Sequence, residues 1–188
     1  MKKKLLFPVF ILIFSIFLSS CSDPVSYNVE KKHEKKIKVI YNMVSGLVEG
    51  DSELYLSTFE PEYIKNVRNV VDTLGRQYFD AENFDDLINS FFYQYEQGLK
   101  SNYGEDIKVA LSFNSVEESS KDSLKPLFDD YSVSYEFPKD NIKTVYNVSV
   151  NLNITSDSYK GSKDSSFTLL EMQNGDIYLH PESFLYSF

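Results

Sequence analysis

The hydrophobic period of this chain changes once, at Gly104, and that change limits the folds open to it. Before Gly104, apolar residues recur every three or four positions, the spacing that places them on one face of a helix. After it, apolar and polar residues alternate, as in a strand with one buried face. Helices first and strands second predict an α+β domain, with N-terminal helices packed on an antiparallel sheet.

Glycine, proline and capping residues divide the helical half into four segments. A first helix is expected over about 33–50, and Asp51 is expected to cap a short second helix. Pro61 suits the first turn of a third helix that ends at Gly75. The fourth and longest helix is predicted over about 81–100, with an aromatic face formed by Phe84, Leu87, Ile88, Phe91, Phe92, Tyr95 and Leu99.

The second half predicts a meander of short strands. Alternation is clearest over 146–154 and is also present over 107–113. Asn174-Gly175 is a strong hairpin signal between strands at 166–173 and 177–180. A short helix at 123–130 and a turn-rich stretch at 159–165 are expected to connect these strands.

The N-terminus has the pattern of an export signal. Three lysines precede an apolar run over 5–18, which is too short to span a bilayer as a permanent helix. The run ends in Leu18-Ser19-Ser20-Cys21, which resembles the lipobox of bacterial lipoproteins. The resemblance implies a signal peptide at 1–20, cleavage before Cys21 and diacylglycerol on its thiol. An ordinary secreted protein with one unpaired thiol, or an uncleaved anchor, is the alternative.

This signal also sets the expected organisation and location. Residues 21–32 are mostly polar and predict a lipidated flexible tether, and 33–188 predict a single domain. Because Cys21 is the only cysteine, an intramolecular disulfide is excluded. The expected location is the bacterial cell envelope, outside the cytoplasm, on the cell membrane or the outer membrane through the lipid on Cys21.

Net charge argues against two classes of partner. Without its first 20 residues the chain has 16 basic and 28 acidic side chains, a formal charge of −12. Nucleic acids and anionic lipid headgroups both require a basic surface. The whole-chain charge therefore predicts no nucleic-acid binding and an anchor that depends on lipid rather than on charge.

The order and length of the elements resemble a known family. The first helix ends in "GLVEGDSELYLSTFEPEY", and an aromatic helix and the strand "VYNVSVNLNI" precede the final hairpin "FTLLEMQNGDIYL". Over about 33–180 this is similar to the nuclear transport factor 2-like, or cystatin-like, α+β cone of certain bacterial lipoproteins. The resemblance implies a curved sheet that often encloses a cavity. The tryptophan usual in the last strand is replaced by Ile177 and Tyr178.

Catalytic and metal-binding signals are weak. His33 and His180 lie at opposite ends of the predicted domain, and neither has a partner at metal-ligand spacing. The acidic cluster Asp80, Glu82, Asp85 and Asp86 is interpreted as favourable charge at a helix N-terminus rather than as a calcium or acid–base site. We therefore expect no metal and no cofactor.

Tyrosines are the strongest remaining candidates for a ligand pocket. If the cone were open, inward-facing rings could hold a small hydrophobic ligand, with their hydroxyls fixing its orientation. Ordinary packing in the core is the alternative. The candidates are Tyr41, Tyr55, Tyr63, Tyr95 and Tyr146.

Three functions are compatible with these observations. The leading hypothesis is a non-enzymatic binding or assembly module of the cell envelope, whose partner is a small hydrophobic ligand or an envelope protein. The second is an isomerase or dehydratase that uses an Asp or His base and a Tyr oxyanion donor in a pocket of the cone. The third is a structural domain that forms a homodimer through the uncharged polar face of strand 147–153.

Overall fold

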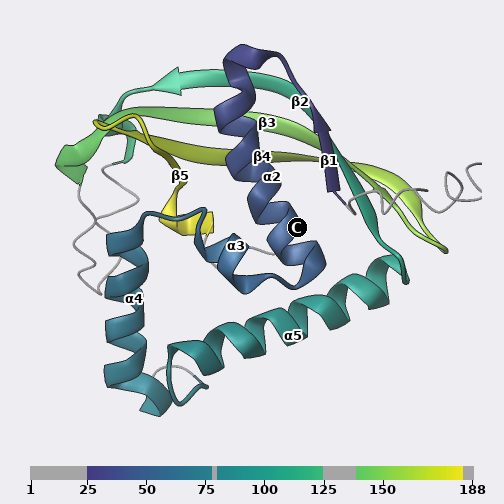
Figure 1. Cartoon of the computed structure of the whole chain (residues 1–188), viewed down its shortest axis with the longest axis horizontal. Coiled ribbons are helices and arrows are strands. Elements are labelled where there is room, and N and C mark those ends of the chain that lie inside the picture. Colours follow the sequence, from purple (N-terminus) through teal and green to yellow (C-terminus); the bar gives the residue numbers. More distant parts are fainter. Residues whose placement is uncertain (1–24, 78–79, 125–138, 184–188) are drawn as a thin grey trace, which may run out of the picture.

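The computed structural model describes residues 25–77, 80–124 and 139–183. The predicted signal peptide, Cys21 and most of the short helix expected at 123–130 lie outside these residues. Residues 121–124 of that region form a 3₁₀ turn, Lys121–Leu124. The fold is α+β, as predicted, with helices packed against one curved sheet of five strands (Figure 1).

The strands follow one another across the sheet in chain order, β1-β2-β3-β4-β5. Three neighbouring pairs are antiparallel, and the pair at one edge, β1 with β2, is parallel. The sheet is therefore mixed, which corrects the expectation of a wholly antiparallel one. The strands are β1 (Val25–Asn28), β2 (Lys108–Ser119), β3 (Ile142–Thr155), β4 (Lys160–Met172) and β5 (Ile177–Leu179).

Strand β1 lies within the segment that was predicted to be a flexible tether. Val25 pairs with Val109 and is 1% exposed, and the Tyr27 ring packs on that of Tyr41 with centroids 5.0 Å apart. The ordered domain thus begins before His33. Four residues of alternating pattern are too few to distinguish a strand from a polar linker, and a parallel partner so distant in sequence leaves no hairpin signal.

Strands β2 and β4 are longer than their hydrophobic alternation indicated. Strand β2 continues to Ser119, and β4 begins at Lys160, inside the stretch expected to be turn-rich. There, Gly161 pairs with Ile154 and Ser162 with Asn153. Backbone pairing with β3 continues the ladder although the side chains of β4 are polar, because the ladder requires only backbone groups.

The helices follow the predicted divisions closely. Gly50 ends the first with a φ of 71°, Asp51 caps the next by accepting a hydrogen bond from the Leu54 amide, and Pro61 occupies the first turn of α4. Asn83 caps the longest helix by accepting a hydrogen bond from the Asp86 amide. The helices are α2 (Glu34–Glu49), α3 (Ser52–Leu56), α4 (Pro61–Leu74) and α5 (Phe84–Tyr103), and the remaining 3₁₀ turns are Lys31–His33, Gly75–Gln77, Lys139–Asn141 and Pro181–Ser183.

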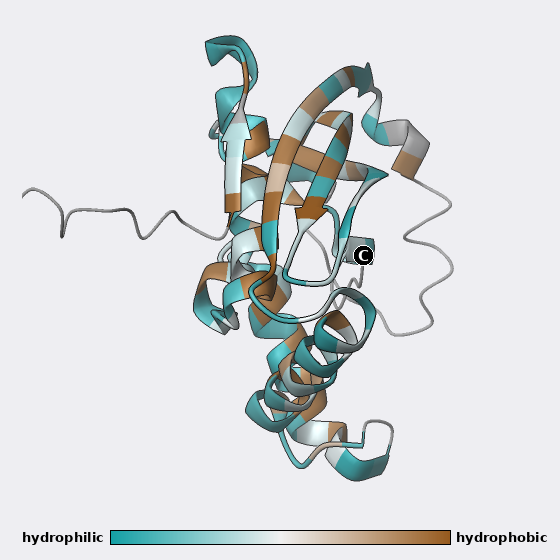
Figure 2. Cartoon of the chain, turned by 90° about the vertical axis from the view of Figure 1, so that its right-hand side faces the viewer, coloured by the Kyte–Doolittle hydropathy of each residue, from teal (hydrophilic) through white to brown (hydrophobic). Residues whose placement is uncertain are grey.

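The core lies between the concave side of the sheet and α2. Figure 1 shows the sheet arched over α2, with α4 and α5 farther from the strands. Ile40, Met43 and Val44 of α2 are fully buried, as are Val148 and Val150 of β3. Figure 2 shows apolar and polar residues alternating along the strands, because alternate side chains face the core and the solvent. These α2 side chains therefore occupy the concave side of the sheet.

Candidate functional site

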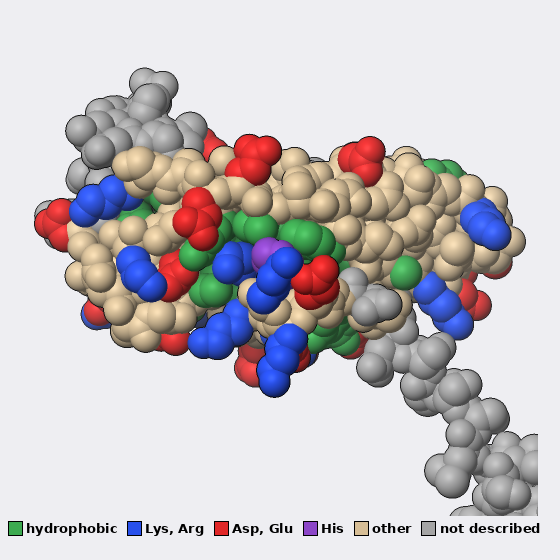
Figure 3. Space-filling view, turned by 90° about the horizontal axis from the view of Figure 1, so that it is seen from above, with side chains coloured by type: hydrophobic (Ala, Val, Ile, Leu, Met, Phe, Trp, Pro, Cys, Tyr) green, Lys and Arg blue, Asp and Glu red, His purple; other side chains and the backbone are tan. Residues whose placement is uncertain are grey.

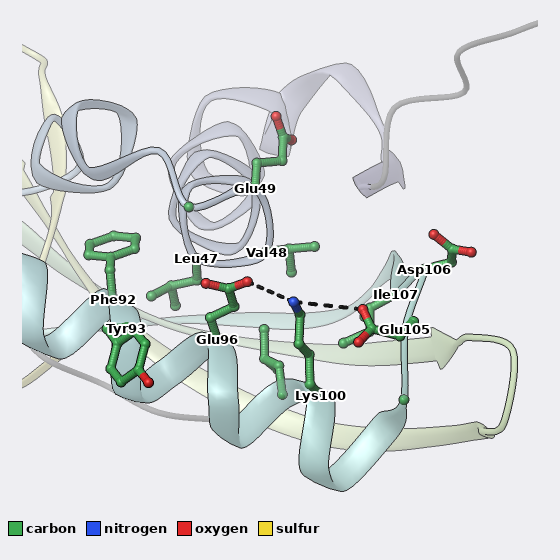
Figure 4. Close-up of a pocket in the computed structure, with 13 residues that line it drawn as sticks. Leu47, Val48, Glu49, Phe92, Tyr93, Glu96, Lys100, Glu105, Asp106 and Ile107 are labelled. Carbon is green, nitrogen blue, oxygen red and sulfur yellow. Dashed lines mark ion pairs between the residues drawn. The ribbon is translucent and has the colours of Figure 1, made fainter.

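A cleft of about 600 Å³ opens beside the C-terminal end of α2, outside the packed core. Its walls are the last turn of α2, the middle of α5 and the segment 104–107 that leads into β2 (Figure 4). The apolar part of its lining consists of Leu47, Val48, Phe92, Leu99 and Ile107. Charged side chains from α5 and from the segment 104–107 cross its mouth in the close-up.

A close approach of backbones positions the α2 wall. At Gly46, an added Cβ would lie 2.8 Å from the Tyr55 amide nitrogen and 2.9 Å from the Asp51 carbonyl oxygen. Only glycine allows α3 to fold back so tightly on α2. The left-handed Gly50 and the Asp51 cap complete this reversal, and they leave Leu47 and Val48 facing α5 (Figure 4).

The opposite rim is held by the turn between β3 and β4. Gly104 has a φ of 88°, and an added Cβ there would collide with Ser158 and Asp157. The Asp157 carboxylate accepts a hydrogen bond of 3.0 Å from the Glu105 amide, and the Ser156 hydroxyl donates to the Tyr103 carbonyl. These contacts fix the direction in which the chain leaves α5, and with it the place of Glu105.

Lys100 lies between two carboxylates in the mouth of the cleft. Its Nζ is 2.9 Å from Glu96 Oε1 and 3.7 Å from Glu105 Oε2 (Figure 4). The hydrogen bond to Glu96, followed by the charge of Glu105, raises the pKa of Lys100 above its ordinary value. Glu49 and Asp106 add two more carboxylates to the lining, which therefore contains one cation and four anions. The cleft is thus acidic at its edge and apolar within.

Three of the predicted pocket tyrosines are parts of an aromatic core instead. Tyr55 is fully buried, and its ring lies 5.3 Å from Phe59 and 5.6 Å from Phe92, centroid to centroid. Tyr63 packs on Phe59, and Tyr95 packs on Phe91. Tyr55, Tyr63 and Tyr95 therefore join the helices to one another and contribute no side chain to the lining of the cleft.

The other two candidates lie elsewhere. Tyr41 packs on Tyr27 beside β1. The Tyr146 hydroxyl donates a 2.5 Å hydrogen bond to Glu171, which also accepts one of 2.7 Å from Lys143. Burial, followed by the bond to Glu171, raises the pKa of Tyr146 to about 12, and the pKa of Glu171 is lowered, chiefly by the Lys143 bond. The five tyrosines do not converge on one pocket.

The histidines and the acidic cluster stay separate as well. The His33 ring stacks on Phe113, whereas His180 is 1% exposed and burial lowers its pKa to about 4. Asp85 pairs with Arg68 at 2.8 Å, and the Asp86 amide is part of the cap of α5. Across residues 25–77, 80–124 and 139–183, no three His, Cys, Asp or Glu side chains gather as metal ligands would.

Sequence patterns did not predict the residues that form the cleft. Phe92 and Tyr93 follow Phe91 directly on α5, and three consecutive aromatic side chains cannot all face one core, since they point in directions about 100° apart. Tyr93 is indeed 65% exposed. Such a run was the available sequence signal that some of these aromatic side chains lie outside the core. The pairing of Glu96 with Lys100 carried none, because the same spacing is common on solvent-facing helix surfaces.

None of the described helices is long and apolar enough to cross a membrane. No protein-family model, no curated protein and no solved structure matches this chain.

Proposed function

We propose that this chain is a lipid-anchored lipoprotein of the bacterial cell envelope, with a nuclear transport factor 2-like domain that acts as a non-enzymatic binding module. The lipobox at Leu18–Cys21 supports the anchor, and the order of elements supports the family. The observation that carries the binding role is the cleft between α2 and α5, which is acidic at its mouth and apolar within.

Charge and shape define the partner. Glu49, Glu96, Glu105 and Asp106 against Lys100 leave three excess negative charges around an apolar interior. A protein segment that carries lysine or arginine beside a leucine-like side chain complements both properties. We therefore infer that the partner is a basic, partly apolar segment of another envelope protein.

The packing inside the cone favours this site over an interior pocket. The apolar face of α2 occupies the concave side of the sheet, and Ile40, Met43 and Val44 are fully buried there. A small hydrophobic ligand in the cone would have to displace this core. Displacing several buried aliphatic side chains would cost several kcal/mol, at about 2–5 kcal/mol for each large side chain lost from its contacts.

A peptide-binding assay tests the cleft. The probe is a fluorescein-labelled short peptide of alternating lysine and leucine, and its anisotropy reports binding to residues 21–188. Glu96→Gln with Glu105→Gln is expected to weaken binding several-fold, because each exposed ion pair contributes up to about 1 kcal/mol. Lys100→Gln is expected to strengthen it, since both carboxylates are then released to the peptide.

The pair Glu62 and Lys65 on α4 provides the matched control. Lys65 Nζ lies 3.3 Å from Glu62 Oε1 on an exposed surface of α4, and neither residue lines the cleft. Lys65→Gln makes the same charge change as Lys100→Gln, and Glu62→Gln removes one of the two negative charges that the cleft pair removes. Both should leave peptide affinity unchanged. If these variants alter affinity as much as the cleft variants do, or if a peptide with glutamate in place of lysine binds equally well, the cleft is not the binding site.

The anchor is tested separately in cells. Radioactive palmitate is expected to label the full chain, and Cys21→Ala is expected to accumulate as unlabelled precursor. Equal labelling of the variant would refute lipidation at Cys21 without affecting the argument for the cleft.

A further inference from the structure

Positive charge is concentrated on one face of this acidic protein. We use the term basic face for five exposed lysines around the start of α2 and the start of β2: Lys31, Lys32, Lys35, Lys38 and Lys108. On the helix side, Lys31, Lys32, Lys35 and Lys38 outnumber Glu30 and Glu34 by two positive charges. Lys108 follows Glu105 and Asp106, which line the acidic cleft. Figure 3 shows several of the basic side chains gathered over the start of α2.

Helical spacing explains why these lysines are exposed together. Lys35 and Lys38 are three residues apart on α2, so they form one stripe along the helix, and Lys31 precedes them in the 3₁₀ turn Lys31–His33. The buried Ile37 and Ile40 point to the opposite side, toward the sheet. Lys36 lies outside the stripe, with its Nζ 4.0 Å from the centre of the Tyr146 ring.

The stripe borders a shallow groove of about 530 Å³ along β1. Lys38 and Lys108 both line this groove, together with Tyr27 and Tyr41. The Lys38 Nζ is 4.7 Å from the centre of the Tyr41 ring. Tyrosine and lysine share an apolar body and a polar end, which suits them to the boundary between headgroups and hydrocarbon.

The groove begins close to the proposed anchor. Only residues 22–24 separate Cys21 from Val25, which lines the groove, so the two Cα atoms can be at most about 14 Å apart. Attraction to a charged surface decays over about 8–10 Å at physiological ionic strength. With lipid on Cys21, the groove would therefore stay within, or just beyond, the range of the bilayer's surface charge.

We propose that the basic face is a membrane-docking surface that contacts anionic phospholipid headgroups and orients the domain on the bilayer. The occupant is a lipid surface, argued from charge complementarity and from the short connection to Cys21, and the proposal rests on the lipid anchor proposed above. The remainder of the mature chain carries the excess negative charge, which the same surface repels. Attraction and repulsion therefore favour one orientation.

Local charge and net charge have different consequences for contact with anionic lipid. A total of −12 disfavours anionic lipid when charge is uniformly spread, but five of the lysines lie on one side. Each lysine near an anionic bilayer contributes about fivefold to membrane partitioning. The local excess at the β1 edge, rather than the total, then determines which side faces the lipid.

Lysine reactivity on vesicles tests the orientation. Residues 21–188 are coupled through the Cys21 thiol to a maleimide lipid, in vesicles of phosphatidylcholine alone or mixed with phosphatidylglycerol. Amine acylation of each lysine is then followed by mass spectrometry. Lys38 and Lys108 are expected to react several-fold more slowly on the anionic vesicles than on the neutral ones, and Lys65 on α4 is expected to react equally on both.

Paired variants supply the quantitative control. Lys38→Gln with Lys108→Gln should lower partitioning of the uncoupled chain onto phosphatidylglycerol vesicles about 25-fold. Lys65→Gln with Arg76→Gln removes the same charge from α4 and its end, and should leave partitioning unchanged. Equal losses in both pairs, or equal protection of Lys65 and Lys38, would overturn the proposal. Because the coupling is chemical, this outcome does not depend on lipidation in cells.

Discussion

Gly46→Ala is expected to destabilise the domain, whereas Gly98→Ala is expected to stabilise it. Both glycines lie inside helices, in α2 and α5, and both changes add one methyl group. At Gly46 the new Cβ would lie 2.8–2.9 Å from backbone atoms of Asp51 and Tyr55, whereas at Gly98 nothing lies within 4 Å. The surroundings therefore determine the sign of the effect.

The magnitudes follow from two opposing contributions. Alanine in a helix interior is more favourable than glycine by about 1 kcal/mol, and Gly98→Ala should gain about that amount. At Gly46 the same gain is opposed by overpacking, which costs about 1–3 kcal/mol and is near its upper value here because two of the three close atoms are backbone. We expect a net loss of about 1–2 kcal/mol for Gly46→Ala.

Urea unfolding followed by helical circular dichroism measures both variants on the same scale. The two midpoints should move in opposite directions from the parent, with a difference in the free energy of unfolding of about 2–3 kcal/mol between variants. Gly46→Ala should also weaken peptide binding, since α3 must move away from the end of α2 that lines the cleft. If both variants are stabilised equally, the close contact between α2 and α3 is wrong.

Two further predictions concern stability. The pKa of His180 is about 4 in the folded protein and about 6.5 when unfolded, so the unfolded chain binds a proton first and stability should fall as pH drops from about 6.5 to about 4. His180→Gln should reduce the difference in unfolding midpoint between about pH 7 and about pH 5, and an unchanged difference would contradict the assignment. Val25→Ala should lose about 1–2 kcal/mol on thermal or urea unfolding, whereas Ser26→Ala, on the exposed side of β1, should change stability by less than about 0.5 kcal/mol. If Val25→Ala leaves the free energy of unfolding unchanged, β1 does not pair as described.

Local chemistry made much of the fold predictable. Gly50, Asp51 and Pro61 each act through their own backbone or the next turn, so the helix boundaries they set could be read from the sequence. The alternation over 146–154 likewise reports directly on a sheet with one buried face. Strand β1 could not be predicted in this way, because its pairing with Val109 depends on residues that are distant in the chain.

The candidate site was harder to predict than the fold. The five tyrosines have apolar surroundings in the sequence, but that property is equally typical of aromatic packing, as Tyr55 shows. The cleft depends on an arrangement that spacing does not reveal, because Leu47 and Val48 of α2 line it together with Phe92 of α5 and with Ile107. Likewise, charge summed over the chain concealed a local excess of lysine around Lys35 and Lys38.

The parallel pairing of β1 with β2 has a consequence for how the domain folds. Val25, where the described part of the chain begins, pairs with Val109, which follows α2 to α5 in the sequence. In a chain that emerges N-terminus first, this edge must wait while α2 to α5 form. The entropy cost of closing the long loop between β1 and β2 therefore falls late in folding. Changes at Val25 should therefore accelerate unfolding more than they slow folding.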